Sequence, residues 1–521
     1  MRREDVDKML ELVSDEHLAG ALQPPRRRPA ARKWGTLAAC LALCVGLGAM
    51  GLRLLPHMGG ASSGTGGSEP DSAADAVFLS YAGPVFPLTV EEGGGELEAR
   101  RSLTYDFSAY APRSESYTAA DGTQKEHTVW SNELQVTDAY QLSNPSDQDQ
   151  TLTLLYPFVA SYISPSQALP ELSAGGQVLE SELLVGASSH SYTGAWGDEE
   201  SGEKLNLQPA TSWQDYKTLL EDGLYQADAL SGAFPLSQET VTVYRFEDAA
   251  STSEENPSLC VELDIDPAKT RVLSYGFHFM DWDEETGHLS IGFSIPEESE
   301  SRYDSPFLLI LVGEDVKDYT LTGSRAGQEP DSPVTVTANV TRTTQPLDQV
   351  LREAFRDYLA LYGAFGSDSD ALSLVSEEQI LSSACRLLYE GGMLSDEVYS
   401  RYETGWLEDI FSDTLSADRI FYLRVQAEIP AGGSLPVQLN FTKQPSFNYP
   451  GTGGSSYERY DMVTRLGSSL SFTSLSATLL GGEWIEIGAQ NYGFDPENGV
   501  EAVNLDLGQE YYYLDVCRRT E

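Results

Sequence analysis

Histidines do chemistry readily at neutral pH, so their spacing is the first feature to test. No two of the six stand at the i, i+4 separation that places a pair of zinc ligands on one face of a helix. Metalloprotease chemistry is therefore not indicated. The six residues are His17, His57, His127, His190, His278 and His288.

An acidic turn separates the last two histidines. Its sequence, DWDEETG over residues 281–287, carries the oxygen ligands that a hard cation such as calcium prefers. An EF-hand loop needs its glycine one position earlier and a later bidentate glutamate, so that family is excluded. We expect an ordinary solvated hairpin. Cation binding stays open, and no metal ligand is assigned.

Neither the serines nor the cysteines give a catalytic assignment. The stretch GASSG at 60–64 has the G-x-S-x-G form of serine hydrolases, but it lies in a Gly/Ser linker without the strand and helix that this motif requires. Three cysteines, Cys260, Cys385 and Cys517, follow the linker, so at least one is free or pairs with another chain. Their pairing stays open. The sequence assigns no catalytic residue and no cofactor, and it favours a non-enzymatic protein.

A transmembrane helix is predicted over residues 34–55. Its first nineteen residues, Trp34 to Leu52, carry no charge. They extend about 28 Å as a helix, which is close to the hydrocarbon thickness of a bilayer. We place four of them within the membrane as markers of the span: Trp34, Leu41, Val45 and Leu52.

Basic residues on the front flank predict the orientation of this helix. They outnumber the single arginine that closely follows the span, so the N-terminus is expected in the cytoplasm and the large C-terminal part outside the cell membrane. The apolar run exceeds the roughly 7–15 residues of a signal-peptide core, which favours an uncleaved anchor and leaves cleavage open. The flanking residues are Arg26, Arg27, Arg28, Arg32 and Lys33 before the span and Arg53 after it.

Charge narrows the range of partners. Residues 1–33 hold 8 basic and 6 acidic residues, so the remaining chain holds 25 basic and 74 acidic residues of the 33 and 80 in total. An excess of acidic residues of this size repels phosphate backbones and anionic lipid headgroups. Nucleic acid and peripheral lipid binding are therefore not expected.

The cytoplasmic tail contains a candidate partner-binding helix at residues 4–21. Its apolar residues Val6, Met9, Leu10 and Val13 recur at helical spacing. Such a helix either lies on the inner leaflet or docks a cytoplasmic partner such as a sigma factor. A tail this short cannot bury a core of its own.

Beyond the linker at 56–75, alternating runs and turns predict antiparallel β structure over residues 76–345. A hairpin is predicted at 134–159 around the turn Asn144-Pro145-Ser146-Asp147, and another at 169–186 around Gly175-Gly176. A capping-box spacing at Thr211–Gln214 predicts one short helix. Further strands are expected at 240–246, 258–265, 270–279, 288–295, 306–312 and 334–342.

A helical insertion is predicted at 346–415, and a C-terminal β segment at 416–521. Ser376 and Gln379 have the spacing of a capping box at the start of the second helix. The predicted fold is mainly β with this α-helical insertion. Antiparallel β-sandwich modules would form an ectodomain tethered by one transmembrane helix.

Several stretches resemble uncharacterised single-pass membrane proteins of Clostridia-type Gram-positive bacteria. The front portion is also similar to membrane-bound anti-sigma-type regulators, which implies partnership with an extracytoplasmic-function sigma factor. The tail lacks the His/Cys cluster of the zinc-binding members. The stretches are KWGTLAACLAL, YQLSNPSDQDQTLTLLYPF, YDMVTRLGSSLSFT and IEIGAQNYGFDPENGVEAVNLDLGQEYYYLDV.

The sequence is therefore compatible with three functions. The first is a membrane-anchored extracytoplasmic β protein that binds an extracellular ligand or envelope component. The second is a transmembrane signalling regulator of the anti-sigma type. The third is a cell-surface hydrolase, which no motif supports.

Overall fold

The computed structural model describes most of the chain after residue 82. The described residues are 83–92, 97–118, 124–131, 133–163, 169–188, 217, 239–252, 257–283, 286–297, 300, 305–325, 334–364, 374–449 and 457–519. The predicted tail, membrane helix and linker lie outside them, as does all but residue 217 of the predicted helix after Thr211. Among the helices described, none combines the length and apolar character needed to cross a membrane.

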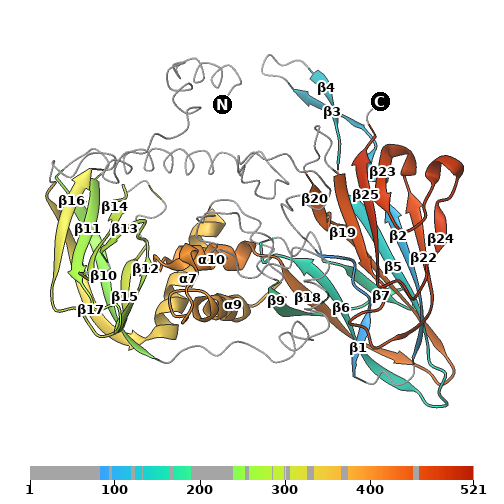
Figure 1. Ribbon diagram of the computed structural model, residues 1–521, viewed down its shortest axis with the longest axis horizontal. Helices are drawn as coiled ribbons and strands as arrows, with labels where there is room; N and C mark the ends of the chain where they lie inside the picture. The colour runs from blue at the N-terminus through green and yellow to red at the C-terminus, as the bar shows by residue number, and fades with distance from the viewer. Residues whose placement is uncertain are drawn as a thin grey trace.

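The described part is mainly β, with several antiparallel sheets, as the sequence predicts (Figure 1). Its largest sheet has seven strands in the order β24-β22-β2-β5-β19-β7-β8. These strands are β2 (Glu98–Asp106), β5 (Leu134–Ser143), β7 (Glu171–Ala174), β8 (Gln177–Val178), β19 (Ser434–Lys443), β22 (Ser471–Leu480) and β24 (Ala502–Asn504).

Two four-stranded sheets accompany it. One has the order β1-β6-β18-β9 and the other β20-β21-β25-β23. A separate two-stranded arm projects from this region. The strands are β1 (Thr89–Glu92), β6 (Gln150–Ala160), β9 (Glu182–Ser188), β18 (Arg419–Ile429), β20 (Phe447–Tyr449), β21 (Tyr457–Val463), β23 (Ile485–Gln490) and β25 (Tyr511–Arg518), with β3 (Arg113–Thr118) and β4 (Gln124–Val129) in the arm.

Strand pairing groups the chain differently from its order in sequence. β2 pairs with β22, β5 with β19 and β6 with β18, so strands before residue 190 share sheets with strands after residue 418. The β2–β22 pair is parallel, whereas the other two are antiparallel. The division of the chain into domains at residues 345 and 415 stays a prediction. The N-terminal and C-terminal strands nevertheless form one assembly.

The middle of the chain forms two further four-stranded sheets, β12-β15-β10-β17 and β13-β14-β11-β16. Inward side chains of both sheets form one apolar cluster, which includes Phe246, Leu259, Phe293 and Leu309. The strands are β10 (Thr240–Ser251), β11 (Pro257–Asp264), β12 (Thr270–Tyr275), β13 (Phe279–Asp283), β14 (His288–Ser294), β15 (Phe307–Gly313), β16 (Tyr319–Arg325) and β17 (Val336–Pro346).

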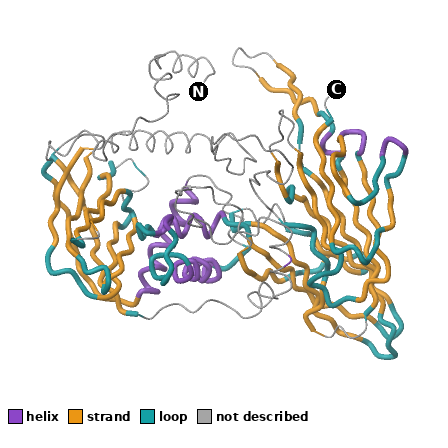
Figure 2. Tube along the Cα trace, in the orientation of Figure 1, coloured by secondary structure: helices purple, strands orange, loops and turns teal. Residues whose placement is uncertain are grey.

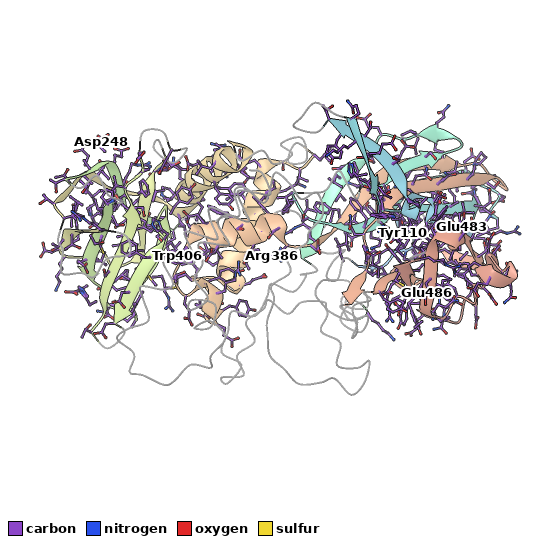
Figure 3. The ribbon with its side chains drawn as sticks, turned by 90° about the horizontal axis from the view of Figure 1, so that it is seen from above. Tyr110, Asp248, Arg386, Trp406, Glu483 and Glu486 are labelled. Carbon is purple, nitrogen blue, oxygen red and sulfur yellow. The ribbon has the colours of Figure 1, made fainter. Side chains whose placement is uncertain are left out.

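Three helices lie between this unit and the larger assembly (Figure 2). They are α7 (Leu347–Ala364), α9 (Glu377–Glu390) and α10 (Leu407–Ser416). The capping box of Ser376 and Gln379 is present at the start of α9, as predicted. Trp406, which precedes α10, forms a bridge with Ser274 of β12 where the helices meet the sheet (Figure 3).

The helices explain why β15 is apolar along its whole length. Leu309 and Leu311 face the neighbouring sheet, whereas Leu308 and Ile310 belong to the cluster that also contains helical residues such as Phe355. A strand covered on both faces shows a continuous apolar run instead of alternation. That second cluster continues through the helices into the larger β assembly.

The predicted hairpin at 134–159 is wrong in its pairing. Both strands exist, as β5 and β6, but they belong to different sheets. The connection between them spans residues 144–149, which is longer than most hairpin loops and passes from one sheet to the other. The hairpin around Gly175-Gly176 is confirmed for β7 and β8, whose turn glycines both have positive φ.

Asn144 holds the crossing between the sheets together. The chain makes a second crossing beside it, from β18 to β19. The side chain of Asn144 is 1% exposed and donates to the carbonyl oxygens of Gln148 at 2.7 Å and Ile429 at 3.2 Å. The amide therefore joins the two crossings by donating to main-chain oxygens of both.

A buried ion pair lies at the centre of the larger assembly. Arg101 of β2 and Asp138 of β5 form two hydrogen bonds, at 2.9 and 2.8 Å, and neither side chain has exposed surface. The hydroxyl of Tyr140 donates to the same carboxylate at 2.7 Å. Arg101 also donates to the main-chain oxygens of Val463 at 2.6 Å and Phe86 at 3.0 Å.

These bonds fix residues 83–90, which we call the strap. Val85 donates to the oxygen of Asp461 at 2.8 Å and accepts from Val463 at 3.0 Å. The amide of Leu88 donates to the hydroxyl of Tyr140 at 3.0 Å. The first described residues of the chain are thereby bound to β5 and β21.

Removing Arg101 should destabilise the assembly strongly. An Arg101→Met variant leaves Asp138 buried without its partner, so we expect a loss of about 3–5 kcal/mol in denaturant unfolding. Arg100→Met is the matched control, because Arg100 lies on the exposed face of the same strand. A loss below about 1 kcal/mol for Arg101→Met would show that the pair is not a main source of stability.

Candidate functional site

The predicted partner and membrane residues lie outside the described part of the chain. They are Val6, Met9, Leu10 and Val13 of the tail, and Trp34, Leu41, Val45 and Leu52 of the predicted span. The structure therefore leaves these assignments as predictions.

The acidic turn at 281–287 connects β13 and β14, which pair from Asp283 and His288 onward. His288 lies between two carboxylates, with Nδ1 2.8 Å from Asp264 and Nε2 3.2 Å from Glu262. The hydrogen bond to Asp264 raises the pKa of His288. His278 instead contacts Ser294 at 3.0 Å. Within the described residues, no three His, Cys, Asp or Glu side chains are arranged to hold a metal ion.

The three described cysteines are free thiols. Burial raises the pKa of Cys260 to about 11 and that of Cys385 to about 12. The pKa of Cys517 is also raised by burial. A thiol must ionise to act as a nucleophile, so these environments oppose cysteine catalysis at neutral pH.

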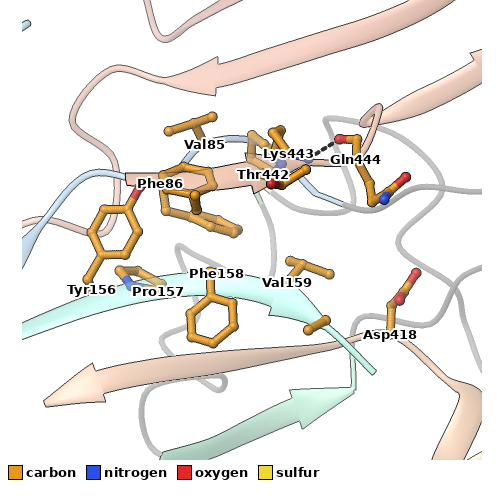
Figure 4. Close-up of a pocket in the computed structure, with 13 residues that line it drawn as sticks. Val85, Phe86, Tyr156, Pro157, Phe158, Val159, Asp418, Thr442, Lys443 and Gln444 are labelled. Atoms are coloured by element: carbon orange, nitrogen blue, oxygen red, sulfur yellow. Dashed lines mark hydrogen bonds between the residues drawn. The ribbon is translucent and has the colours of Figure 1, made fainter. Parts of the chain in front are cut away.

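A small hollow lies where the strap, β6 and the end of β19 meet (Figure 4). Its apolar wall includes Val85 and Phe86 of the strap, Val159 of β6 and Phe441 of β19. Its polar lining includes Thr442 and Lys443 at the end of β19, Gln444 directly after it and Asp418 just before β18. The hollow thus combines an apolar wall with a few polar groups, as binding sites commonly do.

Lys443 is the most unusual residue of the hollow. Its side chain continues the inward face of β19 after Phe441 and is only 8% exposed. Its ammonium group donates to the main-chain oxygen of Gln444 at 2.6 Å. Burial lowers the pKa of Lys443 to about 8, while Asp461 and Asp418 oppose this shift.

Asp461 of β21 is the second buried titratable group in this region. It is 1% exposed, and neither carboxyl oxygen accepts a hydrogen bond in the described structure. Burial raises its pKa to about 7, against the opposing charges of Arg459 and Lys443. Arg459 is itself bound to Asp515 at 2.6 Å. A buried carboxyl and a buried amine with displaced pKa values mark this region as a candidate functional site.

The sequence contains a signal for Lys443, although this residue belongs to no motif. Val437, Leu439, Phe441 and Lys443 occupy alternate positions of one strand, so the lysine falls on the face that the apolar residues bury. A charged residue in the inward register is rare without a function or a partner. No comparable signal identifies Asp418, which contributes to the hollow from the residue before β18.

No family model, curated protein or solved structure matches the chain. The chemistry of the hollow is therefore the observation that carries a functional assignment.

Replacing Asp461 should alter the pH dependence of stability. Its folded pKa of about 7 exceeds an unfolded value of about 4, so its contribution is fully present below pH 4 and is lost as the pH rises to 7. Between pH 4 and 7, the free energy of unfolding of the wild type should fall by up to about 4 kcal/mol relative to that of Asp461→Asn. Above pH 7 the difference between the two proteins should stay constant.

Thermal and denaturant unfolding between pH 4 and 8 measures this difference. The control is Glu428→Gln, which changes an exposed carboxyl of β18. If the free energies of unfolding of the wild type and Asp461→Asn differ by the same amount at every pH from 4 to 8, the pKa of Asp461 is not displaced.

Proposed function

We propose that the chain is a membrane-anchored extracytoplasmic β protein that binds an extracellular ligand or envelope component through the hollow beside Lys443. In this proposal the sheets form β-sandwich modules, residues 34–55 are the tether, and the N-terminus is cytoplasmic. The protein acts by binding and not by catalysis. The supporting observation is the hollow itself, with an apolar wall and a buried lysine and a carboxylate in its lining.

The framework around the hollow supports specific binding. The main-chain oxygen of Phe86 is held by Arg101 at 3.0 Å, so one wall is fixed by the buried ion pair. A site that is already ordered loses less conformational entropy when a ligand binds. The raised thiol pKa values give the hydrolase alternative no support from cysteine chemistry.

Filling the hollow should abolish envelope binding. Val159→Phe adds volume at a half-buried position of the lining. We expect the amount of full-length protein that sediments with insoluble cell envelope to fall at least tenfold. Val178→Phe is the matched control, because Val178 is exposed on β8. Equal sedimentation of both variants and the wild type would contradict binding through the hollow.

One observation favours the regulator as a second candidate. The strap that forms one wall of the hollow is also the first described segment after the predicted linker and membrane helix. A ligand in the hollow would therefore contact the segment that leads toward the tail. Co-purification of a cytoplasmic regulator with the full chain, but not with a chain lacking residues 1–30, is the result that this candidate requires.

A further inference from the structure

The polar lining of the hollow carries both signs of charge. Lys443 contributes an ammonium group from the end of β19, and Asp418 contributes a carboxylate from the residue before β18 (Figure 4). Lys443 is the last residue of β19 and Asp418 directly precedes β18, so the two groups belong to separate segments of the chain. Gln444, beside Lys443, adds an amide that can donate or accept.

The size of the hollow limits what can enter it. Its volume is about 70 Å³. A cavity about twice as large, roughly 150 Å³, holds one benzene molecule, so only a group smaller than a six-membered ring fits wholly inside the hollow.

Charge decides between the small ligands that would fit. A simple anion would be attracted by Lys443 but repelled by Asp418 and by a chain with a net charge of −47. A simple cation would be attracted by Asp418 and repelled by Lys443. A zwitterion places an opposite charge against each group and adds no net charge to a partly buried site.

We propose that the hollow binds a small zwitterionic α-amino acid of the size of glycine or alanine, with its carboxylate at Lys443, its ammonium group at Asp418 and its aliphatic carbon against Val159 and Phe86. The ligand is either a free amino acid or one residue of a larger envelope component, of which only that residue enters the hollow. This inference rests on the proposed function, since it names the ligand class of the same site.

Ligand-dependent thermal stability of the full-length protein in detergent tests the inference. A ligand that binds only the folded state raises the midpoint of unfolding, and the stabilisation grows with the logarithm of the ratio of ligand concentration to Kd. We expect glycine and alanine to raise the midpoint, while propionate, which lacks the ammonium group, and ethylamine, which lacks the carboxylate, bind at least tenfold more weakly. Equal shifts with all four compounds, or no shift with either amino acid, would overturn the inference.

Two variants separate the roles of the charges. Lys443→Met should weaken alanine binding at least tenfold and leave alanine and ethylamine indistinguishable, because the carboxylate of alanine then has no partner. Asp418→Asn should weaken alanine binding and strengthen propionate binding, because the carboxylate that attracts an ammonium group and repels an anion is removed. The matched control is Lys125→Met, which removes an exposed charge on β4 far along the chain from the hollow. Unchanged alanine binding in both hollow variants would overturn the inference even where the folded state is retained.

The comparison with envelope sedimentation distinguishes the two proposals. If Val159→Phe abolishes sedimentation and no amino acid shifts the wild-type midpoint, the hollow binds the envelope but the ligand class is wrong. If alanine shifts the midpoint and sedimentation is unaffected by Val159→Phe, the hollow binds an amino acid and envelope binding through it is wrong.

Discussion

The buried pair of Arg101 and Asp138 is the interaction on which the larger β assembly depends. The guanidinium group contacts β5 through Asp138, the strap through Phe86 and the end of β21 through Val463. Because the pair is fully buried, each charge needs all of these partners to offset its loss of hydration. Three segments that are distant in sequence must therefore all contact Arg101 in the folded state. A folded state that lacked one of these contacts would leave a buried charge without a partner.

This constraint also shapes the hollow. The strap is held on one side by Arg101 and on the other by main-chain bonds to β21, so Val85 and Phe86 present a fixed wall. Lys443 and Asp461 lie in the same region, where burial displaces their pKa values in opposite directions. The stable part of the molecule and its candidate binding site thus share the same segments, and a ligand in the hollow would touch the part of the chain that leads toward the predicted membrane helix.

Local pattern predicted many elements but not their partners. The β-rich runs at 134–159 located β5 and β6, the C-terminal part was predicted as β, and the spacing of Ser376 and Gln379 located the start of α9. The sequence could not show that β5 and β6 lie in different sheets, because period 2 identifies a strand without identifying its neighbour. Arg101, Asp138 and Lys443 all occupy inward positions of alternating strands, and this departure from the apolar pattern can be seen in the sequence. The sequence does not show the partners of Arg101, because Asp138 and Val463 lie 37 and 362 residues away from it.

Hydrogen exchange of the full-length protein, followed by mass spectrometry, tests most directly whether the N-terminal strap and the C-terminal strands form one cooperative unit. We predict that amides of the strap, including Val85 and Leu88, exchange as slowly as those of β5 and β21, since their hydrogen bonds open only when the assembly unfolds. Rapid exchange of residues 83–90 while β5 and β21 stay protected would contradict it, because the strap would then be bound independently of the buried ion pair.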